Sequence, residues 1–456
     1  MYPVLCGFVS KIKAVKMNVQ PQAFSNLRKS FIFFSMLCIF SGLSLAAQEP
    51  KSNNAGLLPE SSRLAILGDS ITKQKIYSKY VETYLLACAG RKDISVFQFG
   101  WSGETAAGFL NRMEKDLSVF KPTAATICYG MNDGKYRPYE DEIGKSYDKS
   151  MRAVMEKLKG MGVTCIVIGT PGAVDTKFFK FKNADAGGKS AAESYNESLK
   201  RLRDFDEKIA SELKLPFADL HSVLIDTMSK AKKAKGDDYD VCGRDGVHPA
   251  PDGHLIMAYA FLKALGCDGN IGKITVDMKG SANATEGHKV VSASDGKIEI
   301  ESTRYPFCFD ADPDKSSSNR SILPYFPFNQ DLNKFLLIVK NLGSAKAKVS
   351  WGGETKEFTR EQLEAGINLA AEFAKTPFDG NFMKVSQAVL EKQTLEMKMQ
   401  QGVISQYRNT AKFSDDELKK AAETLKQMMD ERAKLEVDAK AAIVPVKHSI
   451  TIAPIP

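Results

Sequence analysis

Four short polar blocks hold the residues that could do chemistry: GDSIT (68–72), GWSGET (100–105), YGMND (129–133) and DGVHP (245–249). A serine hydroxyl is a weak nucleophile unless a base removes its proton and a third group holds that base. Ser70 can be the nucleophile and His248 the base, while Asp245 can fix the tautomer of the imidazole and stabilise its charged form. These residue types predict nucleophilic attack on a carbonyl carbon, followed by transfer of the acyl group.

Such a reaction also needs hydrogen-bond donors at the place where negative charge develops. The backbone N–H groups of Ser70 and Gly103 and the side-chain amide of Asn132 can supply them. Glycine at position 103 allows close approach of the backbone to a substrate. Each block alone is a common loop, but the four together, each near the end of a predicted element, indicate an active site.

Other residues near the blocks have plainer interpretations. We expect His254 to be structural rather than a second base, Asp69 to brace the turn that carries Ser70, and Asp133 to hydrogen-bond within its loop. Trp101 has two open interpretations, one in which it lines the cleft and stacks on a sugar ring and one in which it only packs. No spacing of His, Cys or carboxylate residues suits a metal, so we expect neither a metal nor a cofactor.

The elements that must position these blocks alternate between apolar strands and longer helices. The predicted strands are 63–69, 94–100, 123–130 and 163–171, and the predicted helices between them are 77–89, 106–120 and 147–161. Continuously apolar strands separated by helices imply a parallel sheet that is covered on both faces. In such sheets the chemistry collects at the carboxyl ends of the strands, which is where three of the blocks begin.

The four blocks resemble those of the SGNH (GDSL-like) hydrolase family, which is named for Ser, Gly, Asn and His. Block by block, the resemblance implies the nucleophile Ser70, the oxyanion donors Gly103 and Asn132, and the triad acid and base Asp245 and His248. It also implies a carboxylic ester hydrolase with a three-layer α/β/α sandwich around a five-stranded parallel sheet. The match covers residues 62–268, which we take as the α/β domain.

Beyond residue 268 the pattern changes. Short strands at 273–280, 288–293, 297–303, 334–342 and 347–353 predict a small β-rich domain over 270–358. Helices dominate the region 359–445, where Ser414 and Glu417 form a capping box. Two amphipathic helices that meet near Asn409 predict an antiparallel hairpin.

The N-terminal residues have the order of a secretory signal peptide. Arg28 and Lys29 precede an apolar run over 31–45, which ends in small residues at Ala46 and Ala47. We therefore expect residues 1–47 to be removed and the protein to be exported, to a periplasm or the medium. The run is short for a bilayer span, so we expect no stable membrane insertion after cleavage, with an uncleaved anchor as the alternative.

Charge and cysteine content constrain the partners. The formal charge of +8 falls by five, to +3, without residues 1–47, which carry five basic residues and no acidic one. So small a charge argues against binding to nucleic acid. Six cysteines follow the predicted signal, and an exported protein can form disulfides. Cys242 and Cys267 are the first pair to check.

The substrate is less constrained than the reaction. Export and the appended β-rich domain favour a small-molecule or polysaccharide ester, above all an acetylated carbohydrate, with lipase, lysophospholipase or thioesterase activity as alternatives. A different class remains open, an exported binding or scaffold protein whose C-terminal parts carry the function. Only the enzyme would be acylated at Ser70. The oligomeric state is open.

Overall fold

The computed structural model describes residues 56–181, 188–310, 312–315 and 318–456. The predicted signal peptide lies outside these residues. The first sheet is parallel throughout and has the order β2-β1-β3-β4-β5. Its strands are β1 (Arg63–Gly68), β2 (Ser95–Gly100), β3 (Ala124–Cys128), β4 (Cys165–Gly169) and β5 (Phe217–Ala218). The predicted five-stranded parallel sheet is thus confirmed.

The register of this sheet brings the first three blocks to one edge. Gly68 pairs with Gly100 on one side and with Cys128 on the other, so β1, β2 and β3 end level with one another. The loops that follow these strands therefore start side by side. This arrangement is the consequence of parallel strands that was expected from the sequence.

Alternation along β1 gives the sheet two apolar faces. Leu64 and Ile66 point into one buried cluster, and Ala65 and Leu67 point into another. The helices that cover the faces are α1 (Ser70–Lys73), α2 (Ile76–Thr83), its π-helical continuation η1 (Tyr84–Cys88), α3 (Ala106–Leu117), α4 (Asp141–Gly160), α5 (Ala191–Leu213), α6 (Leu220–Lys235) and α7 (Pro251–Ala264). The first cluster includes α2, α6 and α7 and the second includes α3 and α4, which makes the three layers.

The β-rich region consists of two sheets with the orders β13-β10-β6-β7 and β12-β11-β14-β9-β8. Its strands are β6 (Asn270–Asp277), β7 (Ser281–Ala284), β8 (His288–Ser294), β9 (Lys297–Ser302), β10 (Lys334–Lys340), β11 (Lys346–Trp351), β12 (Glu354–Thr359), β13 (Ile367–Asn368) and β14 (Val446–Ile455). Short helices lie among them: η3 (Leu323–Tyr325), α8 (Phe328–Leu332), α9 (Arg360–Ala365) and α10 (Leu369–Glu372).

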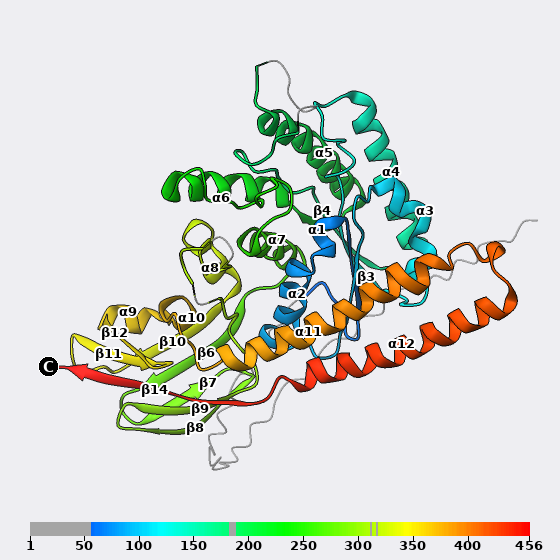
Figure 1. The fold of residues 1–456 in the computed structure, drawn as a ribbon. Helices are drawn as coiled ribbons and strands as arrows, with labels where there is room; N and C mark the ends of the chain where they lie inside the picture. Colours follow the sequence, from blue (N-terminus) through cyan, green and yellow to red (C-terminus); the bar gives the residue numbers. More distant parts are fainter. Residues whose placement is uncertain (1–55, 182–187, 311, 316–317) are drawn as a thin grey trace, which may run out of the picture. The chain divides into compact units, whose positions relative to one another are not determined.

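Four of these strands were not predicted from the sequence: β7, β12, β13 and β14. β14 follows the helical region in the sequence. It lies in the sheet β12-β11-β14-β9-β8, where it pairs with both β9 and β11 (Figure 1). The β-rich part of the chain therefore does not end at residue 358. Its partner strands lie far away in the sequence, so no local pattern links β14 to them.

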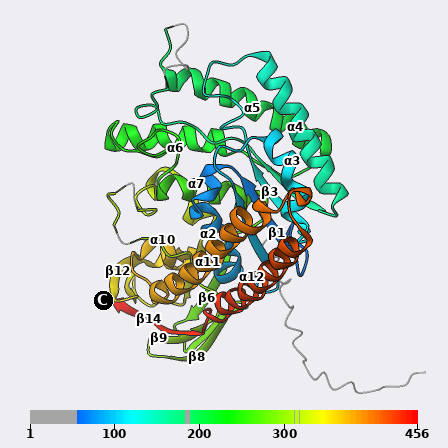
Figure 2. The same cartoon turned by 45° about the vertical axis from the view of Figure 1, so that its right-hand side comes forward.

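The predicted hairpin consists of α11 (Asp379–Met399), its π-helical continuation η4 (Gln400–Ile404) and α12 (Asp415–Ala441), with the short η5 (Thr410–Lys412) at the tip. The two long helices lie side by side (Figure 2). The capping box of α12 is present, because Ser414 Oγ accepts from Glu417 N–H and the Glu417 carboxylate accepts from Ser414 N–H. Leu395, Met399 and Ile404 are buried in the same cluster as α3 and α4.

The hairpin also covers the edge strand β2 with buried charged groups. Lys392 Nζ donates to the carbonyl of Val96 at 2.7 Å, and Arg432 Nη2 donates to the same oxygen at 3.0 Å. Glu396 Oε2 accepts from Gln98 N–H at 3.0 Å. An edge strand normally exposes such backbone groups to water or to another strand. Here the side chains of the hairpin satisfy them.

Cys242 and Cys267, the pair singled out for checking, do not form a disulfide. All six cysteines in the described part of the chain are free, and Cys242 and Cys267 are both buried. Both belong to the larger apolar cluster, where they behave as small hydrophobic residues.

Residues 52–456 form one compact unit, so the predicted domain boundaries near residues 268 and 358 stay predictions. Within the described residues no helix combines the length and the apolar character that crossing a membrane requires.

Candidate active site

Ser70, His248 and Asp245 form a continuous chain of hydrogen bonds. Ser70 begins α1 directly after β1, and its Oγ lies 2.8 Å from His248 Nε2. His248 Nδ1 lies 2.6 Å from Asp245 Oδ2. This is the order of contacts that a serine nucleophile, its base and the partner of that base require.

The loop that carries His248 is held at two points. Asp245 Oδ1 accepts the backbone N–H groups of Val247 and His248, each at 2.9 Å. Gly246 has φ of +79°, and a Cβ there would lie 2.3 Å from the backbone nitrogen of Phe179. Only glycine fits this combination of left-handed backbone and close packing.

The charge of Asp245 suits its place beside the imidazole. Partial burial raises the pKa of Asp245, but the N–H groups of His248 and Val247 and the His248 ring together lower it further, so its pKa lies below the ordinary value. Asp245 is therefore ionised at neutral pH. An ionised carboxylate at Nδ1 holds the proton of the ring there and leaves Nε2 free to accept the proton of Ser70.

The second block forms a tight turn beside the nucleophile. Trp101 N–H donates to the carbonyl of Gly68 at 3.1 Å, and Glu104 N–H closes the turn on the carbonyl of Trp101 at 3.2 Å. Gly103 lies in this turn with φ of +71°, and no atom lies within 4 Å of the place where a Cβ would be. The backbone at Gly103 therefore faces open space on that side.

Asn132 connects the first three blocks. Its Nδ2 donates to the carbonyl of Glu104 at 3.0 Å and to Asp69 Oδ2 at 3.3 Å. Its Oδ1 accepts from the hydroxyl of Tyr136 at 3.0 Å. These partners define which end of the amide is which, with Nδ2 on the side of the nucleophile turn.

The two aspartates next to the predicted site residues brace the loops, as the sequence suggested. Asp69 Oδ1 accepts from Ile71 N–H at 2.9 Å and so caps α1. Asp133 accepts from the N–H groups of Ala106 and Gly130, each at 3.0 Å. Burial raises the pKa of Asp69 to about 7 and that of Asp133 to about 6, against the opposing effect of these N–H groups.

His254 is a buried structural residue. Its Nε2 bonds to Gln74 Oε1 at 2.7 Å, and its ring stacks on Tyr77 with centroids 6.0 Å apart. Burial lowers the pKa of His254 to about 3, so the ring is neutral. It contacts neither Ser70 nor Asp245 in the described hydrogen-bond network.

Trp101 packs against two guanidinium groups. Arg112 of α3 lies 4.9 Å from the centroid of its ring, and Arg408 of the hairpin tip lies 4.8 Å from it. The packing interpretation is therefore supported by contacts, whereas stacking on a sugar ring stays a prediction. The involvement of the hairpin was not expected from the sequence.

Sequence reasoning missed an aromatic group beside Asn132. The ring of Tyr136 stacks on Phe181 with centroids 4.6 Å apart, and Phe181 is 43% exposed. Lys135 and Tyr136 both have left-handed backbones, with φ of +58° and +52°. Non-glycine residues adopt this conformation at some cost, and no recognisable sequence pattern marks it. The only signal for Tyr136 in the sequence is that it follows Asn132 by four residues.

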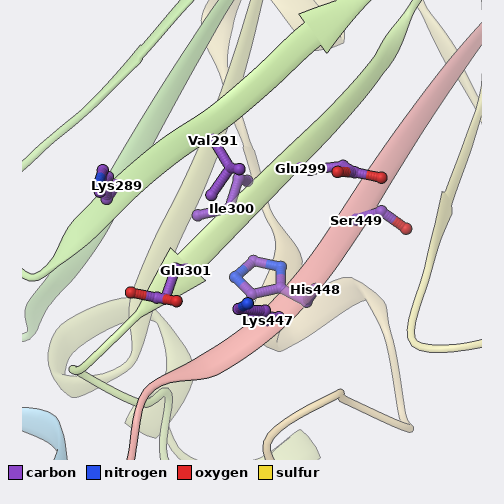
Figure 3. Close-up of a pocket in the computed structure, with 8 residues that line it drawn as sticks. All are labelled: Lys289, Val291, Glu299, Ile300, Glu301, Lys447, His448 and Ser449. Carbon is purple, nitrogen blue, oxygen red and sulfur yellow. The ribbon is translucent and has the colours of Figure 1, made fainter.

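The described residues also form an open depression of about 500 Å³ on the outer face of β8, β9 and β14, away from the residues above (Figure 3). Charged side chains of both signs, such as Lys289, Glu299 and Lys447, line it. We assign no reaction to it. Among the described residues, no group of three or more His, Cys, Asp or Glu could hold a metal ion.

Known proteins are similar to parts of this chain in sequence and in structure. Residues 66–256 match the model of the GDSL-like Lipase/Acylhydrolase family. An acetylxylan esterase of Geobacillus stearothermophilus is 25% identical over 198 residues, which cover 42% of this chain and 80% of that protein.

Solved structures extend the likeness in fold. A gut microbial diltiazem-metabolizing enzyme aligns with a TM-score of 0.68 at 21% identity, covering 87% of this chain and 99% of the other. The likeness therefore includes the β-rich and helical parts. The Geobacillus stearothermophilus acetylxylan esterase Axe2 aligns with a TM-score of 0.37 at 22% identity, covering 46% of this chain and 96% of its own. Residues 66–256 are a domain of the GDSL-like lipase/acylhydrolase family, and the protein is a carboxylic ester hydrolase.

Proposed function

We propose that the protein is an exported serine esterase that removes acetyl groups from a carbohydrate through an acyl-Ser70 intermediate. The observation that carries the proposal is the hydrogen-bonded chain Asp245–His248–Ser70, with contacts of 2.6 and 2.8 Å. A serine activated in this way attacks a carbonyl carbon without a cofactor.

The reaction proceeds in two steps. His248 Nε2 takes the proton of Ser70 as Oγ attacks the ester carbonyl. The resulting oxyanion is held by the N–H groups of Ser70 and Gly103 and by Asn132 Nδ2, which exchanges its 3.3 Å contact with Asp69 for one with the oxyanion. The C–O bond to the alcohol breaks as His248 returns the proton to the leaving oxygen. Water, deprotonated by His248, then attacks the acyl-enzyme and releases the acid and free Ser70.

Two observations support a short acyl group on a ring-shaped alcohol. The relative that is 25% identical is an acetylxylan esterase. Phe181 is one of the large apolar side chains that are exposed in the described part of the chain. Its ring stacks on Tyr136, and the hydroxyl of Tyr136 donates to Asn132. One aromatic face suits the apolar face of a sugar, whereas a long acyl chain needs an extended apolar groove.

The test compares wild type with Ser70→Ala on p-nitrophenyl acetate, butyrate and octanoate and on acetylated xylo-oligosaccharides. We expect wild type to favour the acetate ester and to release acetate from the oligosaccharide. Ser70→Ala should lose on the order of 10⁴-fold or more in kcat, as other enzymes do without their serine nucleophile. Ser118→Ala, which changes a serine at the end of α3, should keep full activity. Equal turnover by wild type and Ser70→Ala would exclude Ser70 as the nucleophile, and preference for octanoate would point to a lipase.

Export has its own test. Expression of the full chain in a Gram-negative host, followed by mass determination of the protein from the periplasm, should give a new N-terminus immediately after Ala47. An intact N-terminus in the membrane fraction would instead identify residues 31–45 as an anchor.

A further inference from the structure

The turn that carries Gly103 is attached to a cluster of four charged side chains. Two of them, Arg112 and Asp116, come from α3, and Glu104 comes from the turn itself. The fourth is Arg408, which lies just beyond η4 at the tip of the C-terminal hairpin. The cluster therefore joins the second sequence block to a part of the chain about 300 residues away.

Each charge in this cluster has a partner of the opposite sign. Arg112 bonds to the carboxylates of both Glu104 and Asp116. Arg408 holds Asp116 with two hydrogen bonds, from Nε to Oδ1 at 2.7 Å and from Nη2 to Oδ2 at 2.8 Å. Asp116 is completely buried, so it depends on these two guanidinium groups for the stabilisation that water would otherwise supply. Two positive and two negative groups leave the cluster neutral.

The cluster contacts both ends of the turn, Trp101 and Glu104. At its first residue, the guanidinium groups of Arg112 and Arg408 lie 4.9 and 4.8 Å from the centroid of the Trp101 ring. At its last residue, Arg112 holds the carboxylate of Glu104, while the carbonyl of Glu104 accepts from Asn132 Nδ2 at 3.0 Å. Gly103 lies between these two points. A shift of the cluster would thus move both Gly103 and Asn132, the two groups that we assign to the oxyanion besides Ser70.

We propose that Arg408 is a positioning residue for the esterase reaction: it clamps the Trp101–Glu104 turn so that the C-terminal hairpin sets the geometry of the oxyanion site. This inference rests on the proposed function, since it concerns the rate of the same reaction. Without Arg408, Asp116 keeps Arg112 as a partner and competes with Glu104 for it. The ring of Trp101 also loses one of its two cationic neighbours.

The test measures the steady-state hydrolysis of p-nitrophenyl acetate by Arg408→Met and Arg408→Lys. Titration of Ser70 with a p-nitrophenyl phosphonate counts the competent molecules, so that kcat refers to folded enzyme. For Arg408→Met we expect kcat to fall about 10-fold or more, because small displacements of a catalytic group cost this much or more, with KM within about twofold. The midpoints of the pH–rate profile should not move, since the contacts of His248 are untouched. Arg408→Lys should recover part of kcat by restoring the charge without the paired hydrogen bonds.

Fluorescence gives a readout of the clamp that does not depend on turnover. The chain has two tryptophans, and Trp351 is buried with 1% exposure, so acrylamide quenching reports mainly on Trp101. Quenching should increase in Arg408→Met and remain unchanged in the matched control Lys412→Met, which removes an exposed charge from the same hairpin tip. If Arg408→Met does not fold, Arg408→Met with Asp116→Asn removes the buried charge that has lost one of its two partners and should show the same loss of kcat.

The outcomes separate the two proposals. A wild-type enzyme that loses activity with Ser70→Ala, together with a kcat of Arg408→Met within twofold of wild type, would overturn the clamp and leave the proposed function intact. The clamp would also be overturned if Lys412→Met lost as much kcat as Arg408→Met, or if quenching of Trp101 did not change. A wild-type protein without Ser70-dependent hydrolysis would overturn both.

Discussion

At the scale of single residues, the site contains two carboxylates with opposite environments. Asp245 receives backbone N–H groups and the imidazole, and its pKa lies below the ordinary value. Asp69 is completely buried one residue before the nucleophile, and its pKa rises to about 7. The first can stabilise a charged imidazole at neutral pH, whereas the second serves the turn through its hydrogen bonds to Ile71 and Asn132. Environment, rather than residue type, separates the two functions.

The hydroxyl of Tyr136 orients the amide of Asn132, and Tyr136→Phe removes only that hydroxyl. We expect kcat to fall about 3- to 10-fold, the value of one neutral hydrogen bond, while KM stays unchanged because the ring still stacks on Phe181. Steady-state kinetics on p-nitrophenyl acetate measure both. Tyr259→Phe is the control, because that hydroxyl donates to Asp331 instead. Unchanged kcat in Tyr136→Phe would mean that Asn132 is oriented by Glu104 and Asp69 alone.

The raised pKa of Asp69 predicts a dependence of stability on pH. An unfolded aspartate has a pKa of about 3.9, so between about pH 4 and pH 7 the folded chain holds a proton that the unfolded chain has lost. The contribution of Asp69 to the free energy of unfolding is thus present below pH 4 and is lost as the pH rises to 7.

Asp69→Asn keeps a residue that can cap α1 and removes this titration. The free energy of unfolding of wild type minus that of the variant should therefore fall from pH 4.5 to pH 7.5 in urea titrations. Asp277→Asn is the control, because the hydrogen bonds from Asn341 and from the N–H of Lys279 lower the pKa of Asp277 and place its titration below this range. A difference that stays constant for Asp69→Asn would show that Asp69 does not titrate there.

At the scale of elements, side chains of the hairpin satisfy backbone groups at the edge of the parallel sheet. β2 is an edge strand, and Lys392, Glu396 and Arg432 supply the hydrogen bonds that a further strand would have made. Lys392 Nζ also lies 3.0 Å from Glu82 and 2.7 Å from Glu396, and all three side chains are buried. Such a group stabilises the fold only while all its members are present.

Lys392→Met tests this network. The change leaves the buried carboxylate of Glu82 without its cation and the carbonyl of Val96 with Arg432 alone, so we expect the free energy of unfolding to fall by about 3–5 kcal/mol. Urea unfolding followed by circular dichroism measures it. Lys398→Met, at an exposed position six residues further along the same helix, should change stability by less than about 0.5 kcal/mol. Equal stability of the two variants would contradict the role of the network.

The elements also show what the sequence can and cannot predict. Apolar runs such as 63–69 and 123–130 predicted β1 and β3 within two residues, because buried strands need nothing beyond their own side chains to be recognised. Ser414 and Glu417 predicted the start of α12 because capping is a local interaction. The partners of β14, the contact of Arg408 with Trp101 and the left-handed backbone of Tyr136 depend on tertiary packing, and no local pattern encodes them. The roles of the predicted site residues stay predictions until the variants are measured.

At the scale of the whole molecule, the α/β part and the C-terminal parts share contacts throughout. The solved structure with a TM-score of 0.68 aligns over 87% of this chain, so the combination of the parts recurs in another protein. The hairpin adds Leu395, Met399 and Ile404 to the apolar cluster on one face of the parallel sheet, covers the edge of that sheet and contacts the turn of Gly103. We therefore expect the α/β part to depend on the hairpin for both solubility and activity.

A fragment of residues 56–268 tests that dependence. Without the hairpin, the edge of β2 and the apolar surface that receives Leu395 and Met399 are uncovered, and such an edge can pair with another chain. We expect the fragment to aggregate in size-exclusion chromatography, whereas residues 52–456 remain dispersed. A monomeric, active fragment would establish the boundary near residue 268 as that of an independent domain.

The place of β14 in its sheet has a consequence for synthesis. β14 lies between β9 and β11, and Val446 pairs with Ser302, so the centre of the sheet consists of residues that are synthesised after the whole hairpin. Until residue 455 has emerged, β9 and β11 are present without the strand that joins them. Assembly of this sheet therefore follows synthesis of the hairpin, and it must close a loop of more than 140 residues that contains the whole hairpin. Because closing so long a loop is slow, we expect it to limit the rate at which newly made chains become active.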